Sequence, residues 1–287
     1  MPELPEVEIT KRSLSKHILH QKIKAVTIIN PRLRYRLNKK TFAGILNQKI
    51  SNVKRRSKYI LIHTTKKDVL LIHLGMTGRF YFMHSKEKKI DTSFYTSNSI
   101  IQKHDHLKIS FAEFDLVYND IRKFGFIKLL KEADLDNVSH LEKLGPEPLS
   151  KEFNKKYLYE QLRKKKLSIK NFLMSQQNVS GLGNIYVNEA LFFSKIHPER
   201  ECFKINKIKV EILLKHIKKI LSKAILKGGS TIDNYHNSEG KTGSYQANFR
   251  VYGREGETCL TQRCSSTIKR KFSMGRSFFF CPNCQRI

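Results

Sequence analysis

The sequence has no apolar run that approaches the roughly 20 residues of a membrane-spanning helix. Its N-terminus also has no apolar segment of the kind found in signal peptides, and it contains no internal repeat. These absences argue against a membrane protein and a secreted protein, so we expect a cytoplasmic protein with no membrane partner. The 287 residues suffice for two domains with cores of their own.

Acidic residues are scarce in this sequence. The chain has 25 Asp and Glu against 55 Lys and Arg, which gives a formal net charge of +30. A charge of this size calls for a polyanionic partner, and nucleic acid is the first candidate. Charge alone leaves ribosomal, tRNA and DNA binding open.

Cysteine is also rare, and four of the five cysteines form two close pairs near the C-terminus. Cys259 lies close to Cys264, and Cys281 lies close to Cys284, which leaves Cys202 apart. In a reducing compartment this spacing favours a zinc site over disulfides. Four thiolates would fill a tetrahedral shell, so we expect one structural Zn²⁺.

The opening MPELPEVE places Pro2 and Glu3 directly behind the initiator methionine. Once Met1 is removed, Pro2 has a secondary amine with a pKa of roughly 8, so a neutral fraction exists at physiological pH. Such an amine can attack a sugar carbon and form an iminium, and Glu3 can give or take the proton. The alternative is an amphipathic helix that begins near Pro5, and such a helix would itself fix the terminus in place. Its apolar residues are Val7, Leu14 and Ile18.

Alternating or continuous apolar residues predict strands in the first part of the chain. These strands lie at residues 23–30, 58–64, 69–74 and 107–111. Short segments of this kind predict a β-sandwich that extends to about residue 135. Two prolines and a glycine at 144–150 then predict an interdomain connection.

Apolar residues at helical spacing predict helices in the second part. They lie at residues 157–162, 169–174, 185–193 and 210–225, with Gly228 just beyond the last helix. The polar stretch 230–252 predicts a long loop, which the cysteine pairs follow. The fold class is therefore α+β.

Five further residues in the first part of the chain have candidate chemistry, and Lys58, Met76 and His104 each have a plainer alternative. Lys58 ends a basic run and could be a solvated charge. Met76, in a glycine-flanked turn, could be a wedge between bases or a buried hairpin methionine. Arg122 and Phe124 follow another strand and could hold open a duplex from which a base is flipped out. His104 could be a core histidine or a metal ligand.

A second basic run, Lys164 to Lys166, precedes the glycine-containing turn GLGN at 181–184. Glycines before a helix leave backbone N–H groups free to hold a phosphate, with Asn184 as the cap or as a direct ligand. The alternative is an ordinary capped turn.

The string MPELPEVE resembles the opening of the formamidopyrimidine-DNA glycosylase (Fpg) family. The motifs HLGMTGR, KHDH, NDIRKFG and GLGN and the cysteine ribbon follow in the family's order over nearly the whole chain. The resemblance implies a catalytic β-sandwich domain with a leading helix, a helical helix-two-turns-helix domain and a terminal zinc ribbon. The implied segments are the sandwich at 1–135, a linker at 136–150, the helical domain at 151–229, a lesion-covering loop region at 230–252 and the ribbon at 253–287.

The resemblance also implies an activity, that of a DNA-formamidopyrimidine glycosylase that is also an AP lyase. The enzyme would remove 8-oxoguanine and formamidopyrimidines from duplex DNA. Pro2 would be the Schiff-base nucleophile, Glu3 the acid–base group, Lys58 the proton donor for β-elimination, and Arg276 would assist δ-elimination. The implied DNA contacts are Met76, His104, Arg122, Phe124, Lys165 and Asn184. The implied partner is damaged double-stranded DNA, bound by a monomer that acts on the nucleoid in the bacterial cytoplasm.

The sequence departs from the family pattern at two places. The first cysteine pair encloses four residues where the family usually has two, which leaves a different knuckle geometry possible. The segment 83–101 is longer than the family leads us to expect, and we interpret it as a surface insertion.

Two other functions stay open. The endonuclease VIII branch of the family removes oxidised pyrimidines, but Leu4, together with Met76, Arg122 and Phe124, favours the Fpg branch. The second alternative is a noncatalytic zinc-ribbon protein that binds nucleic acid. Such a protein would not require Pro2, Glu3 and Lys58, so their joint presence argues against it.

Overall fold

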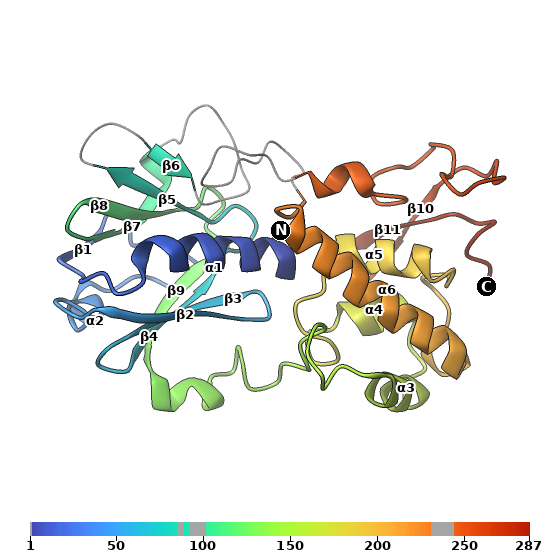
Figure 1. Cartoon of the computed structure of the whole chain (residues 1–287), viewed down its shortest axis with the longest axis horizontal. Coiled ribbons are helices and arrows are strands. Elements are labelled where there is room, and N and C mark those ends of the chain that lie inside the picture. Colours follow the sequence, from blue (N-terminus) through green and yellow to red (C-terminus); the bar gives the residue numbers. More distant parts are fainter. Residues whose placement is uncertain (1, 85–88, 92–101, 231–243) are drawn as a thin grey trace. The chain divides into compact units, whose positions relative to one another are not determined.

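The computed structural model describes residues 2–84, 89–91, 102–230 and 244–287, and it divides into two compact units (Figure 1). The sandwich unit comprises Met1–Glu142 and Ile225–Gln246, and the helical unit comprises Lys143–Ala224 and Ala247–Ile287. Most of the predicted insertion at 83–101, and residues 231–243 of the predicted lesion-covering loop region, lie outside the described residues.

Two antiparallel sheets and a leading helix build the sandwich unit. The five-stranded sheet has the order β1 (Ala25–Ile28), β7 (Asp105–Ser110), β8 (Phe114–Asn119), β5 (Arg79–His84) and β6 (Lys89–Asp91). The four-stranded sheet has the order β2 (Ile50–Arg56), β3 (Tyr59–Thr64), β4 (Asp68–His73) and β9 (Phe126–Lys131). The helical elements are α1 (Leu4–Ile18), α2 (Lys39–Ala43), η1 (Gln102–His104) and η2 (Glu132–Asn137). The β-sandwich prediction is confirmed.

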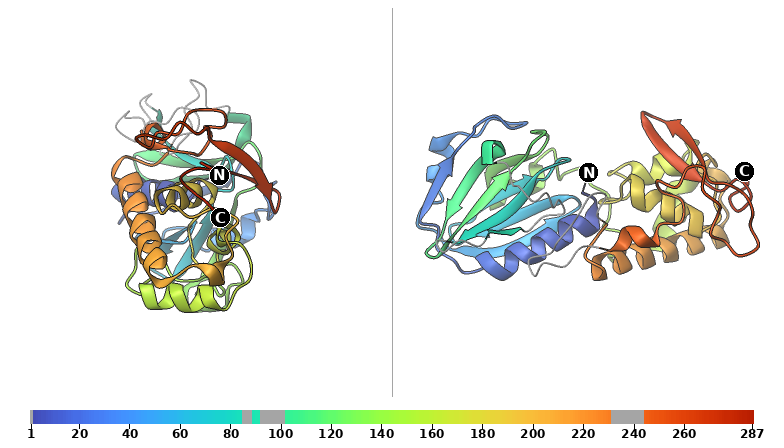
Figure 2. Two further views of the ribbon diagram at one scale, coloured as in Figure 1. Left: turned by 90° about the vertical axis from the view of Figure 1, so that its right-hand side faces the viewer. Right: turned by 90° about the horizontal axis from the view of Figure 1, so that it is seen from above.

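One apolar core joins α1 to both sheets. Val7, Leu14 and Ile18 of α1 pack in the same buried cluster as residues from β3, β4, β5 and β7, and α1 runs alongside the sheets in the right-hand view (Figure 2). A second, smaller cluster covers the opposite face of β3 and β4 with residues from η2 and the segment after it. Because both faces of β4 are covered, its sequence reads as a continuous apolar run rather than as an alternation.

Helices and a terminal hairpin form the helical unit. Its helices are α3 (Lys155–Arg163), α4 (Ile169–Met174), α5 (Asn184–Phe193), η3 (Cys202–Lys204) and most of α6 (Lys207–Leu226), and η4 (Tyr245–Asn248) lies at the unit boundary. Strands β10 (Lys269–Ser273) and β11 (Arg276–Phe280) pair as an antiparallel hairpin. Among the residues that the structure describes, no helix combines the length and the apolar character needed to cross a bilayer.

Local signals set the helix boundaries. The side chains of Asn154 and Ser168 accept N–H groups at the start of α3 and α4. Gly228 follows α6 with φ of +77°, a left-handed conformation that glycine adopts at no steric cost. The four predicted helices are thus confirmed, each within a few residues of its predicted bounds.

We expect Leu14→Ala to destabilise the sandwich unit by about 2–5 kcal/mol, because the fully buried side chain leaves a cavity between α1 and the sheets. Leu226→Ala makes the same chemical change at a side chain that is 82% exposed, and should alter stability by less than about 0.5 kcal/mol. Urea unfolding followed by circular dichroism measures both. Equal losses in the two variants would contradict the shared core.

Candidate active site and nucleic-acid interface

The N-terminal residues are held at the first turn of α1. Pro2 is buried, and Glu3 is 3% exposed and forms the N-cap. Glu3 and Glu6 make a capping box, in which the Glu3 N–H donates to Oε2 of Glu6 over 2.9 Å. The helix interpretation of this stretch is therefore confirmed, and the helix begins directly behind the predicted nucleophile.

Glu6 has a contact that the sequence did not reveal. Its second oxygen, Oε1, accepts both the backbone N–H and the hydroxyl of Ser230, each over 2.9 Å. Ser230 comes 224 residues later in the chain. Local sequence rules identified Glu6 only as an acid in the first turn of a helix, and they cannot identify a partner so distant.

Lys58 lies in the turn between β2 and β3, behind Ser57, whose φ is +55°. Its exposure is 5%, so the interpretation of Lys58 as a solvated charge is wrong. Burial, together with the nearby charges of Lys58 and Arg34, lowers the pKa of His73 to about 4. A neutral His73 fits its hydrogen bond, because Nδ1 accepts the Gly75 N–H over 3.1 Å.

Two loops that carry Met76 and the Arg122–Phe124 pair pack against each other backbone to backbone. A Cβ on Gly75 would lie 2.4 Å from the Gly125 nitrogen. Thr77 joins the loops through polar contacts, since its hydroxyl donates to Oδ1 of Asp120 over 2.5 Å and accepts the Arg122 N–H over 3.0 Å. The structure thus brings together three residues that the sequence placed on separate strand exits.

The side chains at the tips of these loops project from this packed base. The Arg122 guanidinium lies 4.7 Å from the centre of the Phe124 ring, and the Phe124 side chain is 48% exposed. Met76 is half-buried, so it is not the core methionine of the alternative interpretation. An exposed cation and an exposed ring are available here to a ligand, beside a half-buried thioether.

The KHDH motif contains two histidines with different environments. His104 is half-buried in η1, and its carbonyl accepts the Asp120 N–H over 3.0 Å, which places it beside the Arg122 loop. His106 is fully buried between the carbonyls of Asn30 and Asp120. The core-histidine interpretation therefore fits His106 and is wrong for His104. Among the described residues, the only candidate metal cluster is formed by cysteines, without histidine.

In the helical unit, α5 holds the strand that begins with Arg276. Nδ2 of Asn184 donates to the Ser277 carbonyl over 2.9 Å, and Oδ1 of Asn188 accepts the Phe279 N–H over 2.8 Å. The N-cap of α5 is Gly183, so the prediction of Asn184 as a cap was wrong. Arg276 is exposed, and these two amides fix the backbone just behind it.

Two buried charges in this unit were missed by the sequence analysis. Lys170 is 1% exposed and donates to the Arg276 carbonyl over 3.3 Å; burial and the Arg276 charge lower its pKa. Glu189 accepts the N–H groups of residues 250, 251 and 252 over 2.9–3.0 Å. Burial raises the pKa of Glu189, although these three hydrogen bonds oppose the shift. Both charges lie on apolar helix faces, and that placement in the sequence could have indicated that they are buried.

Lys165, by contrast, is exposed as its basic run predicts.

The structure brings the four paired cysteines together, and Cys202 stays apart. All four Sγ atoms lie within 4.8 Å of one another. Hydrogen bonding from Asn283 lowers the pKa of Cys264 to about 6, whereas burial raises the pKa of Cys284 to about 12. Four thiols this close repel one another when ionised, so a bound cation is needed for all of them to be thiolates.

The fold and these sites define a two-unit α+β protein with a cysteine-cluster ribbon and exposed groups suited to nucleic acid. Two family models match it: the formamidopyrimidine-DNA glycosylase N-terminal domain over residues 1–127, and the formamidopyrimidine-DNA glycosylase H2TH domain over residues 144–236. The formamidopyrimidine-DNA glycosylase of Roseobacter denitrificans is 38% identical over 100% of both chains. That of Psychromonas ingrahamii is 39% identical over 99% of this chain and 100% of its own.

Solved structures agree with these matches. Lactococcus lactis Fpg in complex with DNA containing an abasic site has a TM-score of 0.87 and 36% identity, and the match covers 99% of this chain and 100% of that one. The same protein with DNA containing Fapy-dG has a TM-score of 0.85 and 35% identity, with 99% and 100% covered. The chain therefore belongs to the formamidopyrimidine-DNA glycosylase family, as the opening motif predicted.

We expect Gly125→Ala to destabilise the loop pair by about 2–3 kcal/mol, since the added Cβ would lie 1.9 Å from the Tyr118 hydroxyl. In a Tyr118→Phe background the cost should fall by about 1 kcal/mol, because that oxygen is gone. Gly44→Ala is the control, because its Cβ would meet its nearest atom at an ordinary 3.6 Å. Urea unfolding measures each variant, and an equal cost of Gly125→Ala in both backgrounds would contradict the clash.

Proposed function

We propose that this protein is a bifunctional DNA glycosylase and AP lyase that removes 8-oxoguanine and formamidopyrimidines from duplex DNA. The observation that carries the proposal is the buried, capped N-terminus, which holds Pro2 and Glu3 in fixed positions at the start of α1. Family membership and the net charge of +30 support DNA as the partner.

In the proposed reaction the Pro2 amine, freed by removal of Met1, attacks the anomeric carbon of the flipped nucleotide. The bond from that carbon to the base breaks, and the base leaves with a proton supplied by acid–base exchange with Glu3. Ring opening gives an iminium between Pro2 and the sugar. The iminium acidifies the neighbouring C–H, so β-elimination and then δ-elimination cleave the strand, assisted by Lys58 and Arg276.

DNA contacts follow from the exposed groups of each unit. Met76, Arg122 and Phe124 would fill the void that the flipped base leaves, because the helix must stay open at a cost of a few kcal/mol. The proposed phosphate contacts are His104, Lys165 and Asn184. The Asn184 amide also donates to the Ser277 carbonyl, so its phosphate contact would have to use the second hydrogen of the amide nitrogen. We propose a monomer in the bacterial cytoplasm.

The cysteine cluster fits zinc. Three Sγ–Sγ separations are 3.7 to 3.8 Å, and a tetrahedron with Zn–S bonds of about 2.3 Å has edges of about 3.8 Å. Cys259, Cys264, Cys281 and Cys284 would hold one Zn²⁺, which would stabilise the ribbon that carries Arg276. The four residues between the first two cysteines do not prevent the four sulfurs from meeting.

We expect borohydride to trap a covalent adduct at Pro2 on a duplex with one 8-oxoguanine opposite cytosine, because reduction fixes the iminium. Mass spectrometry of the adduct locates the residue. Pro2→Gly should lose most of the cleavage activity, whereas Pro5→Ala, at the other proline of the motif, should retain it. The matched undamaged duplex should give no adduct. Binding without any adduct, on this lesion or on an oxidised pyrimidine, would favour a noncatalytic protein.

We expect about one zinc per chain by metal analysis, and a chelator should lower both the melting temperature and the affinity for DNA, because structural zinc sites contribute directly to folding. Cys264→Ser should lose the metal. Cys202→Ser is the matched control and should keep it, since Cys202 lies outside the cluster. Full zinc content in Cys264→Ser would rule out the assigned ligand set.

A further inference from the structure

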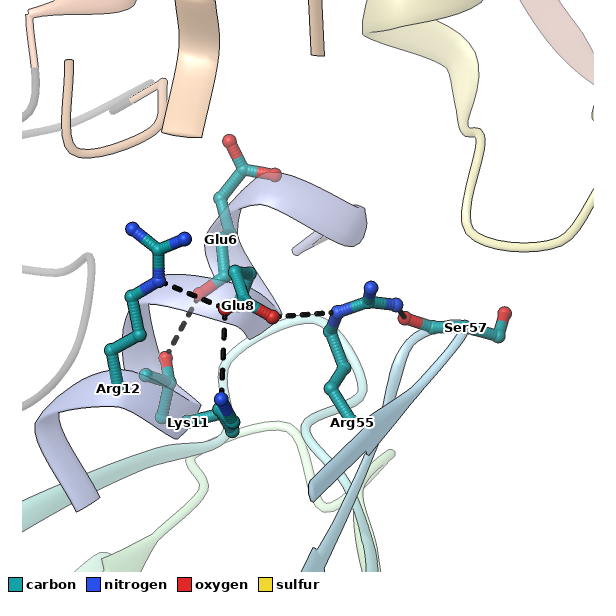
Figure 3. A network of polar contacts seen from close by, with 7 residues as sticks. Glu6, Glu8, Lys11, Arg12, Arg55 and Ser57 are labelled. Carbon is teal, nitrogen blue, oxygen red and sulfur yellow. Dashed lines mark hydrogen bonds and ion pairs between the residues drawn. The ribbon is translucent and has the colours of Figure 1, made fainter. Parts of the chain in front are cut away.

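A single guanidinium connects α1 to the turn that carries Lys58. Nε of Arg55, in β2, donates to Oε2 of Glu8 over 3.0 Å, and its Nη1 donates to the Ser57 carbonyl over 2.9 Å. Figure 3 shows the Arg55 side chain between these two acceptors. The Arg55 and Glu8 side chains are only 12% and 14% exposed, so solvent competes little with either contact.

The chemistry of the groups makes this link rigid. A guanidinium is planar and presents its N–H donors at fixed angles, so two bonds from one guanidinium fix their acceptors relative to each other. Burial alone would raise the pKa of Glu8, but Arg12, Lys11 and Arg55 hold it below its ordinary value, so Glu8 is ionised near neutral pH. A charged acceptor makes the Arg55–Glu8 bond one of the stronger kind.

Each end of the link leads to a group of the proposed mechanism. Glu8 belongs to the helix whose first turn holds Pro2 and Glu3. Ser57 directly precedes Lys58 and has a φ of +55°, a conformation that non-glycine residues adopt uncommonly. The hydrogen bond to the Ser57 carbonyl therefore stabilises an unfavourable turn at the residue that orients Lys58.

We propose that Arg55 is a positioning residue for strand cleavage, which acts by holding the Lys58 turn in register with the helix that carries Pro2. The inference rests on the proposed function, because it assumes that Pro2 and Lys58 act on the same sugar. Formation of the iminium needs Pro2 and the acid–base group Glu3 but not Lys58, whereas its β-elimination needs the proton transfer assigned to Lys58. Loss of Arg55 should therefore slow the second step and spare the first.

The chain supplies a matched control at the same carboxylate. Nε of Arg12 donates to Oε1 of Glu8 over 2.9 Å, but the Arg12 side chain is 56% exposed and lies on α1 itself. Arg12→Gln and Arg55→Gln remove the same charge and one guanidinium from Glu8. Only Arg55→Gln also removes the guanidinium hydrogen bond to the Ser57 carbonyl.

The experiment uses a duplex with a preformed abasic site and excess enzyme, so that each rate reports a single turnover. Arg55→Gln should cleave about 10- to 100-fold more slowly than the wild type, the range expected for misplacement by a fraction of an ångström to an ångström. Its Kd for the duplex should stay within about 3-fold, since the side chain is mostly buried, and its borohydride-trapped iminium should match or exceed the wild-type amount. Arg12→Gln should cleave within about 2-fold of the wild type.

A double variant tests whether Arg55 acts through Lys58. Arg55→Gln combined with Lys58→Gln should cleave no more slowly than Lys58→Gln alone, because residues that act as a unit are not additive. The proposal would be overturned if the rate losses of the two single variants multiplied in the double variant, or if Arg12→Gln slowed cleavage as much as Arg55→Gln. A fall in trapped iminium that matched the fall in the cleavage rate of Arg55→Gln would overturn it too. If Arg55→Gln does not fold, Glu8→Gln tests the other end of the link. A Glu8→Gln protein with the wild-type ratio of trapped iminium to cleaved strand would also overturn the proposal. Wild-type protein that neither traps nor cleaves would instead refute the proposed function.

Discussion

The arrangement of the N-terminus depends on the carboxylate of Glu6. Chain ends commonly fray, yet here Glu6 accepts the N–H of Glu3 with one oxygen and two donors of Ser230 with the other. Several donors directed at one carboxylate form strong, directional contacts. The first turn of α1 and the residue that precedes segment 231–243 are therefore fixed to the same group. The proposed amine nucleophile would gain from such restraint, because the entropy of orienting it is lost on folding rather than during the reaction.

The loop pair shows a second constraint, which concerns space rather than charge. The loops that carry Met76 and Phe124 can lie side by side only if their backbones approach closely. Gly75 and Gly125 allow that approach, because any Cβ at either position would overlap neighbouring atoms. The Asp120 carboxylate then accepts the Thr77 hydroxyl and the Gly125 N–H, which joins the two loops. Rigid bases of this kind let exposed side chains keep a defined direction.

The sequence predicted what depends on local periodicity and failed where distant partners decide. The four predicted helices and four of the strands followed from apolar spacing, because side chains at that spacing fill the core. No bounds were predicted for strands β2, β5, β8 and β9. The position of Asn184 before a helix suggested a cap, but its amide binds Ser277, 93 residues away, and Gly183 takes the cap position. The basic run before Lys58 suggested a solvated lysine, because its burial depends on tertiary packing. The catalytic role of Lys58 came from the family motif alone and stays a prediction.

The placement of the acidic residues explains how so basic a chain keeps its cations available. Among the described residues, six acids are buried: Glu3, Glu6, Asp68, Asp105, Asp120 and Glu189. Asp105 accepts hydrogen bonds from the Tyr81 hydroxyl and the Asn119 amide, and Glu189 accepts three backbone N–H groups. A buried carboxylate satisfied by neutral donors needs no lysine or arginine beside it. In these contacts Asp105 and Glu189 neutralise no surface cation, whereas Asp68 pairs with Lys131. Burial of acids among neutral donors therefore helps to preserve the positive field that attracts a polyanion.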